Sequence, residues 1–298
     1  MHIDHMPTWK NLKHGQQWLN TLLDYAFPKI GRMPIDSIGQ PEALMCLSPI
    51  WTDKHETARR LAQRIKTVLD VAKSKGFRSG ENPVTAIKDA QILPKVKVKL
   101  QHHDAIPWRD VPAFFTKLNE RSATTAKALQ FTVLTASRTT EVLDMTWPEV
   151  DVEARLWTVP ATRMKGGKEH RVPLTDDMLA ILEPFKAMAS VYVFEEQKRH
   201  KLLSNMSMLM LLRRMGRDGF TVHGFRSSYW DWAAEAANAP RKLVKATLAH
   251  QVGSNIVRAY ARSDLLEWRW ELMNDWISQC REKISGGKYG KTKGRHAH

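Results

Sequence analysis

The stretch Arg155-Leu-Trp-Thr-Val-Pro-Ala-Thr-Arg-Met-Lys-Gly-Gly-Lys-Glu-His-Arg-Val-Pro-Leu174 decides the fold class, because its pattern differs from the sequence around it. Residues 155–159 and 170–174 are typical of short β-strands, and the Lys-Gly-Gly-Lys segment at 165–168 is typical of a turn between them. Helical periodicity returns on both sides of this hairpin. The sequence therefore predicts a mainly α protein with a small β-sheet.

Apolar residues at three- and four-residue spacing predict helices on both sides of the hairpin. They fall at 109–121, 123–136, 139–146, 176–189, 204–216, 224–237, 240–248 and 263–282. The last of these is rich in Leu and Trp. Docking on a neighbouring subunit and packing within its own domain are both open for it.

The N-terminal third has its clearest helical pattern over residues 54–75. Asp53 followed by Glu56 resembles a capping box at its start, and Gly76 is a natural stop. The basic residues of this helix lie mostly off its apolar stripe. They form either a solvated face or a face that contacts a nucleic-acid backbone.

A basic, proline-bounded stretch from Pro94 to Pro107 separates the two sets of helices. We interpret it as an extended linker, and a length of 298 residues fits two domains of roughly 150 residues each. We expect a helical domain over 1–93, the linker over 94–107, an α+β domain over 108–284 and a disordered basic tail over 285–298.

The charge balance is the informative part of the composition. The 46 Lys and Arg residues against 31 Asp and Glu residues give a net charge of +15. Such an excess attracts polyanions, so nucleic acid is the favoured partner. A basic enzyme without such a partner and binding to an anionic membrane surface are the alternatives.

Other classes of protein are disfavoured. No apolar run is long enough to span a membrane, and the N-terminus lacks the pattern of a secretory signal, so we expect a cytoplasmic protein. Cys46 and Cys280 form no CxxC pair, which argues against a disulfide framework or zinc ribbon and suggests two packing thiols.

Arg138 lies at the predicted start of a helix that also carries Glu141. A positive charge is unfavourable at a helix N-terminus, so a bound anion explains the arginine better than helix stability does. Glu141 would brace the guanidinium group. The alternative is a surface arginine paired with Glu141.

Further polar residues follow in order along the chain. His223 and Arg226 share a face if their turn is helical, although such a pair alone is a weak signal. His250 and Tyr260 lie ten residues apart across a glycine turn, where a tyrosine can simply be a packing residue. Lys165 alone would be a solvated hairpin tip.

The order of these residues resembles the tyrosine recombinase family, the phage and genomic-island integrases. Arg163-Met-Lys165-Gly-Gly-Lys, Leu248-Ala-His-Gln-Val-Gly and Glu267-Trp-Arg-Trp-Glu-Leu-Met resemble segments of prophage and island integrases. The resemblance covers roughly 50–282 and is densest over 131–276. It implies a helical core-binding domain and a C-terminal catalytic domain that together clamp duplex DNA.

The resemblance also implies a role for each residue in DNA strand cleavage and rejoining through a 3′-phosphotyrosine. Tyr260 would be the nucleophile, and Lys165, on a mobile hairpin, would protonate the leaving 5′ oxygen. Glu141 would support the site. The scissile phosphate would be held by Arg138, Arg226, His223 and His250, with His223 also accepting a proton.

The implied partner is attachment-site DNA of a mobile element, bound by a homotetramer, with accessory DNA-bending or directionality proteins left open. No cofactor or metal is implied, because the arginines supply the positive charge. Many island integrases carry a further arm-site domain. The core-binding pattern here starts within about ten residues of Met1, so two-site DNA binding stays open.

Two other functions remain open. A type IB topoisomerase uses a similar residue set but relaxes supercoils as a monomer. A non-catalytic DNA-binding regulator could use the same scaffold. Tyr229, three residues after Arg226, is a rival nucleophile, ranked below Tyr260 because its Tyr-Trp-Asp-Trp surroundings indicate a core position.

Overall fold

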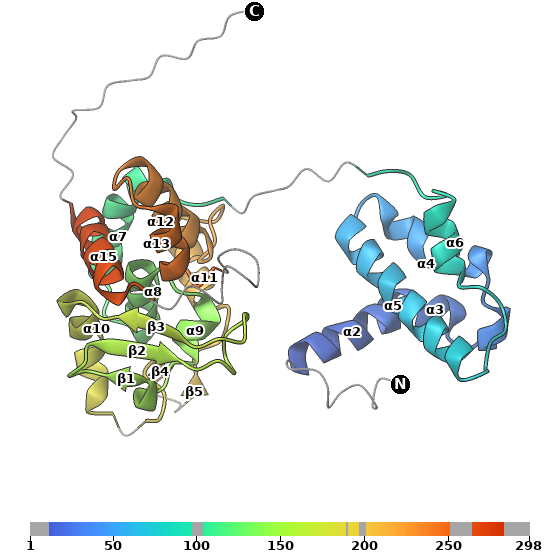
Figure 1. The fold of residues 1–298 in the computed structure, drawn as a ribbon, viewed down its shortest axis with the longest axis horizontal. Coiled ribbons are helices and arrows are strands. Elements are labelled where there is room, and N and C mark those ends of the chain that lie inside the picture. Colours follow the sequence, from blue (N-terminus) through green and yellow to red (C-terminus); the bar gives the residue numbers. More distant parts are fainter. Residues whose placement is uncertain (1–11, 97–103, 189, 197–200, 251–263, 283–298) are drawn as a thin grey trace, which may run out of the picture. The chain divides into compact units, whose positions relative to one another are not determined.

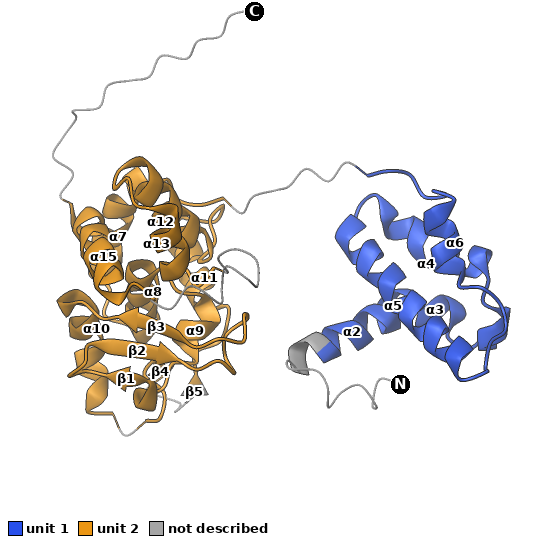
Figure 2. Cartoon of the chain, viewed as in Figure 1, with its two compact units in different colours: residues 1–101 blue, residues 102–298 orange. Residues whose placement is uncertain are grey.

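The fold was obtained as a computed structural model, which describes residues 12–96, 104–188, 190–196, 201–250 and 264–282 (Figure 1). The chain divides into two compact units, Met1–Gln101 and His102–His298 (Figure 2). The finer domain limits expected from the sequence stay a prediction, and the expected tail over 285–298 lies outside the described residues.

The first unit is helical. Its elements are α2 (Leu12–Tyr25), α3 (Phe27–Ile30), the 3₁₀ turn η2 (Ile35–Ser37), α4 (Gln40–Trp51), α5 (His55–Ser74) and α6 (Pro83–Asp89). Its core is formed by the apolar faces of these helices, with Leu47 and Leu61 almost fully buried where α4 packs on α5.

The ends of α5 show one correct and one wrong expectation. Gly76 takes a positive φ of 74° just after the helix, a conformation that glycine adopts without strain, so the predicted stop is confirmed. The predicted capping box is wrong. Lys54 is the N-cap residue, and the Glu56 carboxylate instead accepts hydrogen bonds from Arg59 and Arg60, one turn further along α5.

The second unit combines helices with a small antiparallel sheet, which confirms the predicted fold class. It begins with η3 (Trp108–Asp110), α7 (Val111–Asn119), α8 (Thr124–Thr135), α9 (Thr139–Leu143) and η4 (Trp147–Glu149). The sheet follows as β1 (Val150–Asp151), β2 (Leu156–Val159) and β3 (His170–Pro173), in the order β1-β2-β3. Val159 pairs with His170, so residues 160–169 form the loop that joins β2 to β3.

The remaining elements complete the unit. They are α10 (Asp176–Lys186), a two-stranded ribbon of β4 (Glu195–Glu196) and β5 (Lys201–Leu202), α11 (Ser207–Arg214), α12 (Gly224–Glu235), α13 (Arg241–Thr247) and α15 (Leu266–Arg281). The sequence pattern gave no sign of β1, β4 or β5, because two-residue strands are too short to show alternation.

The core of the second unit is built around α8, whose residues from Leu129 to Thr135 are all buried. Phe131 packs against Trp157 of β2, and Trp276 of α15 donates a hydrogen bond from Nε1 to the carbonyl oxygen of Val133 (2.9 Å). The described part of α15 therefore packs within its own unit. Cys46 and Cys280 are both buried and free, as packing thiols are.

No helix in the described residues is both long and apolar enough to cross a membrane.

Candidate functional site

Arg138 and Glu141 form a braced pair where α8 gives way to α9. Ala136 closes α8 in the left-handed conformation, and Arg138 is the N-cap residue of α9. The Glu141 side chain is only 3% exposed. Its carboxylate accepts hydrogen bonds from the Arg138 backbone N–H (2.9 Å) and from Arg138 Nη1 (2.6 Å). The predicted bracing of the guanidinium group by Glu141 is therefore present, while the arginine side chain stays partly open to solvent.

Arg226 lies in the first turn of α12 and is almost completely buried. Nη1 donates to the carbonyl oxygen of Ala136 (2.5 Å), at the end of α8. Nη2 donates to the carbonyl oxygen of Leu248 (2.6 Å), just after α13. One guanidinium group thus joins the start of α12 to the ends of α8 and α13, the helices that directly precede the segments of Arg138 and His250.

The electrostatics around Arg226 are unusual for an arginine. Burial lowers its pKa to about 10, with the nearby charge of Arg138 lowering it further and Glu141 opposing the shift. It is still protonated at neutral pH. A guanidinium group has five N–H donors, and Nε has no hydrogen-bond partner among the described residues. The site therefore holds a buried positive charge with donor capacity left over.

His250 adds a neutral ring to this cationic cluster. Arg226 Nη2 donates a hydrogen bond to His250 Nε2 (3.2 Å), which requires that Nε2 carry no proton. Desolvation lowers the pKa of His250 to about 4, and the charges of Arg226, Arg138, His223 and Lys245 lower it as well. At neutral pH the ring is therefore uncharged, with its proton on Nδ1.

His223 is the N-cap residue of α12 and has an exposed side chain. The next residue, Gly224, lies close to the backbone of Asp104 and Ala105. A Cβ atom there would lie 3.0 Å from both the Ala105 Cα and the Asp104 carbonyl oxygen. The absence of a side chain at Gly224 therefore sets how closely the start of α12 approaches residues 104–105.

Lys165 lies in the loop between β2 and β3, as the sequence predicts, and its side chain is exposed. Gly167 takes a positive φ of 63°, in keeping with the predicted turn. The structure brings Arg138, Glu141, Arg226 and His250 together through the contacts given above. Among the described residues, the Lys165 side chain forms no hydrogen bond or ion pair with this cluster.

The predicted nucleophile, Tyr260, lies outside the described residues, so its placement stays a prediction. Its rival Tyr229 is fully buried, and its ring packs against those of Trp232 and Trp276. Burial raises the pKa of the Tyr229 hydroxyl, which disfavours the phenolate that a nucleophile needs. The interpretation of Tyr229 as a core residue is confirmed.

Sequence reasoning missed a second cluster between β3 and the start of α15, in which Arg269 and His170 are buried. Arg269 is 1% exposed, and its Nη2 donates to the Arg171 carbonyl oxygen (2.5 Å) and lies 3.5 Å from His170 Nε2. Arg171 in turn donates from Nε to Asp264 (2.8 Å). Asp264 is the first described residue after the stretch that contains the predicted nucleophile, and its ion pair with Arg171 joins it to β3.

His170 responds strongly to its surroundings. Burial lowers its pKa to about 3, and the charges of Arg269, Arg226 and Arg138 contribute in that order. The dependence on Arg226 and Arg138 links this cluster electrostatically to the predicted site. No local pattern points to this cluster, because Arg269 stands between two tryptophans and His170 lies in a strand.

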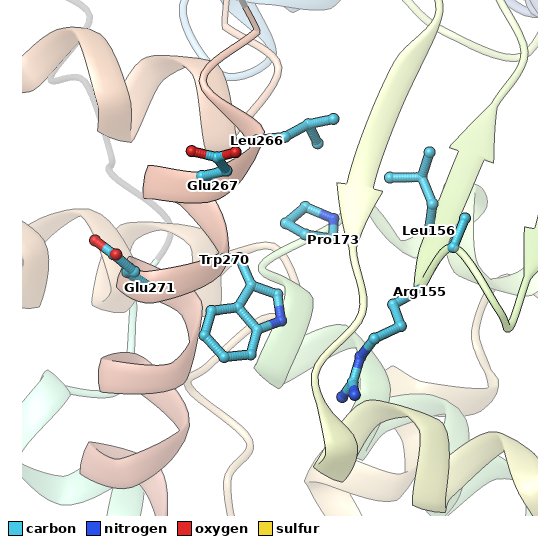
Figure 3. Close-up of a pocket in the computed structure, with 8 residues that line it drawn as sticks. Arg155, Leu156, Pro173, Leu266, Glu267, Trp270 and Glu271 are labelled. Atoms are coloured by element: carbon cyan, nitrogen blue, oxygen red, sulfur yellow. The ribbon is translucent and has the colours of Figure 1, made fainter.

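The described residues include no group of three His, Cys, Asp or Glu side chains placed to hold a metal ion. A surface groove of about 440 Å³ lies between the sheet and α15, lined in part by Arg155, Leu156, Pro173 and Trp270 (Figure 3). None of the described residues that line it is a predicted site residue.

Comparison with known proteins decides the family. Residues 106–266, more than half of the chain, match the phage integrase family, and residues 1–90 match the phage integrase central domain. The chain belongs to the phage integrase family. The family resemblance inferred from the sequence is thereby confirmed.

Relatives of this integrase-family chain include prophage and phage integrases. It is 31% identical over 268 residues to prophage integrase IntA of Escherichia coli K12, a match that covers 87% of this chain and 63% of IntA. It is 28% identical over 297 residues to the integrase of Shigella phage Sf6, covering 94% of this chain and 74% of the relative. The chain thus spans less than two thirds of the length of IntA.

Solved structures share the integrase fold. A lambda integrase tetramer bound to a Holliday junction superposes with a TM-score of 0.67 at 15% identity, covering 85% of this chain and 76% of that one. A lambda integrase dimer bound to a core site has a TM-score of 0.65 at 16% identity, covering 90% and 94%. At 15–16% sequence identity, these similarities show a shared fold and nothing more.

Proposed function

We propose that this chain is a site-specific DNA recombinase that integrates or excises a mobile element. The observation that carries the proposal is the cluster of Arg138, Arg226 and His250, in which Glu141 and two backbone carbonyl groups hold the guanidinium groups in place. Preorganised donors of this kind stabilise charge that develops on an anionic substrate, each by about 3–4 kcal/mol. A phosphodiester fits such a site because arginine binds phosphate oxygens in a planar fork.

The proposed reaction is a transesterification. The Tyr260 Oη attacks the phosphorus atom and forms a 3′-phosphotyrosine, while the bond from phosphorus to the 5′ oxygen breaks. His223 accepts the phenol proton, and Lys165 gives a proton to the leaving 5′ oxygen. A free tyrosine has a pKa near 10, so only about 0.1% is ionised at pH 7 without such help. The reverse reaction with a different 5′ hydroxyl rejoins the strands, and no external energy source is consumed.

The partners follow from the same proposal. Duplex attachment-site DNA is the substrate, and a homotetramer on DNA is the proposed assembly, supported by the tetrameric lambda structure that shares the fold. The net charge of +15 supports binding to DNA. Each phosphate that the protein neutralises should add about −0.9 to the slope of log affinity against log salt concentration. Accessory proteins and a cytoplasmic location remain predictions.

The experiment is to trap a covalent adduct on a nicked suicide substrate made from the ends of the element, and to map the modified residue. Tyr260→Phe should abolish the adduct and retain DNA binding, whereas Tyr229→Phe is the matched control that still forms it. An adduct that survives in Tyr260→Phe and disappears in Tyr229→Phe would overturn the assignment. EDTA should leave adduct formation unchanged, since the two guanidinium groups supply the positive charge.

The same preparations separate the alternative functions. Relaxation of a supercoiled plasmid without exchange between two attachment sites would identify a topoisomerase. Binding without any adduct in the unmodified protein would identify a regulator. Strand exchange between two sites supports the recombinase.

A further inference from the structure

Arg163, two residues before Lys165, is held by a fork of hydrogen bonds. Its Nε donates to Glu149 Oε1 (3.0 Å), and its Nη2 forms a second, short contact with Glu149 Oε2. The two side chains are 21% and 11% exposed. A bidentate pair of this kind fixes orientation as well as distance, which a single contact does not. The first half of the β2–β3 loop is therefore tied to η4.

The carboxylate of Glu149 is itself fixed. Glu149 Oε2 also accepts a hydrogen bond from Nε1 of Trp157 (3.0 Å), a residue of β2 that is fully buried in the core. One carboxylate thus receives hydrogen bonds from the strand that enters the loop and from the loop itself. Arg163 has a rigid partner, since neither Trp157 nor the strand around it can shift without disturbing the core.

The loop backbone adds further restraint. The Arg163 N–H donates to the Pro160 carbonyl oxygen (3.0 Å), and the Met164 N–H donates to that of Ala161 (3.2 Å). Met164 is 8% exposed and belongs to the core of the unit. Lys165 follows directly and is exposed. Its backbone is therefore attached to a bonded segment, and the loop on that side is more restrained than a freely mobile hairpin.

Arg163 also reaches the braced pair described above. Its Nη1 donates to the carbonyl oxygen of Glu141 (3.2 Å), the residue whose carboxylate holds Arg138. Glu141 therefore contacts the predicted phosphate-binding arginine through its side chain and the Lys165 loop through its backbone. Two residues of chain span at most about 7 Å, so an anchor at Arg163 limits where Lys165 can lie.

We infer that Arg163 is a positioning residue that fixes the Lys165 loop relative to Arg138, so that the lysine can reach the leaving oxygen of a phosphate held by that arginine. The inference rests on the proposed function, because it takes Lys165 as the general acid. A purely structural role for Arg163 would lower folding stability without acting on protonation of the leaving group in particular.

The test compares two suicide substrates, one with the ordinary bridging 5′ oxygen and one with sulfur in its place. A thiolate is a good leaving group and needs no proton, so cleavage of the sulfur substrate bypasses the acid. Arg163→Gln should slow cleavage of the oxygen substrate by about 100-fold, the order of loss that a misplacement of about 1 Å can cause. It should cleave the sulfur substrate at close to the unmodified rate.

Arg155→Gln is the matched control. Arg155 also pairs with a carboxylate, that of Asp176, and donates from Nε to a backbone carbonyl group, that of Leu174 (3.3 Å), but at the opposite end of the hairpin. It should leave both cleavage rates unchanged. Arg163→Lys keeps the charge without the fork and should give an intermediate loss on the oxygen substrate alone. If Arg163→Gln does not fold, the comparison of the two substrates is made with Arg163→Lys instead.

Lys165→Ala separates failure of this inference from failure of the proposed function. If sulfur restores cleavage by Lys165→Ala and not by the Arg163 variants, Lys165 is the acid and Arg163 does not position it. If sulfur restores neither, the assignment of Lys165 in the proposed function fails, and the inference with it. Equal losses on both substrates in Arg163→Lys, or no loss on either, would also overturn the inference.

Discussion

Arg226 Nη2 lies 3.2 Å from His250 Nε2, and a donated hydrogen bond there fixes the histidine as the neutral partner. The same guanidinium group also bonds to two backbone carbonyl oxygens at helix ends. A positive charge and an uncharged ring thus stand side by side in the site. An anion that enters the site would raise the pKa of His250, because negative charge favours protonation of the ring.

The first prediction concerns the ionisation of His250. Its pKa is lowered to about 4, so the ring should be neutral at pH 7 and gain a proton only as the pH falls toward 4. In an NMR titration, Arg226→Gln should raise the pKa toward the ordinary value, because one of the charges that oppose protonation is removed. Bound attachment-site DNA should raise it as well.

Arg109→Gln is the control for that titration, since Arg109 is an exposed arginine of the same unit that pairs with Glu235. It should leave the His250 resonance unchanged. A His250 midpoint that stays the same in Arg226→Gln would show that the contact does not set the ionisation of the ring.

The second prediction concerns the bracing of Arg138. Glu141→Gln removes the ion pair but can keep the hydrogen bond to the Arg138 N–H, so the guanidinium group should become mobile. We expect adduct formation to fall by about 10- to 100-fold and the unfolding free energy by about 1–3 kcal/mol, the usual cost of breaking a buried charged contact. Rates of suicide-substrate cleavage and urea unfolding measure the two effects.

Glu183→Gln is the matched control for Glu141. Glu183 pairs with Lys186 at the same three-residue spacing, but its side chain is 65% exposed. Exposed pairs contribute at most about 1 kcal/mol, so neither measurement should change noticeably. Similar losses in both variants would mean that burial of Glu141 is not what matters.

Much of the fold could be predicted because its elements have long, clear periodicity. The pattern over 54–75 corresponds to α5, and that over 123–136 corresponds to α8. The hairpin was evident from a change of period followed by a glycine turn. The capping box failed because two residues at the right spacing do not determine which one caps. Glu56 finds arginines one turn away instead.

In the predicted site too, contacts between residues close in sequence could be predicted, and contacts between distant residues could not be predicted from local patterns. Arg138 and Glu141 lie three residues apart, so their pairing follows from local geometry. The contact of Arg226 with His250 spans 24 residues, and it was expected only from the family resemblance. The cluster of Arg269, Arg171 and His170 was missed because its members are 98 and 99 residues apart, and nothing local to either segment shows burial.

The third prediction concerns acid stability and His170. Burial and nearby arginines lower its pKa to about 3, whereas an unfolded chain has a histidine pKa near 6.5. Between these values the unfolded state binds a proton that the folded state does not. The stability contribution is therefore present above about pH 6.5 and is lost as the pH falls toward 3. It can change by up to about 1.4 kcal/mol per pH unit.

Urea unfolding at several pH values between 7 and 4.5 measures this dependence. His170→Gln should flatten the fall in unfolding free energy on acidification, whatever it does to stability at pH 7, because glutamine has no proton to gain. An unchanged slope in this variant would place the acid sensitivity in other groups.

The fourth prediction uses Gly224, at the start of α12. A Cβ atom would lie 3.0 Å from the backbone of both Asp104 and Ala105, and backbone atoms cannot rotate away as a side chain can. Gly224→Ala should therefore displace the first turn of α12, which follows the N-cap residue His223 and carries Arg226. We expect a loss of about 1–3 kcal/mol in unfolding free energy, the usual cost of overpacking. Gly219→Ala is the matched control, because a Cβ atom there meets nothing within 4 Å. If Gly224→Ala matched Gly219→Ala in thermal unfolding and in suicide-substrate cleavage, the close approach would not be needed to hold Arg226 in place.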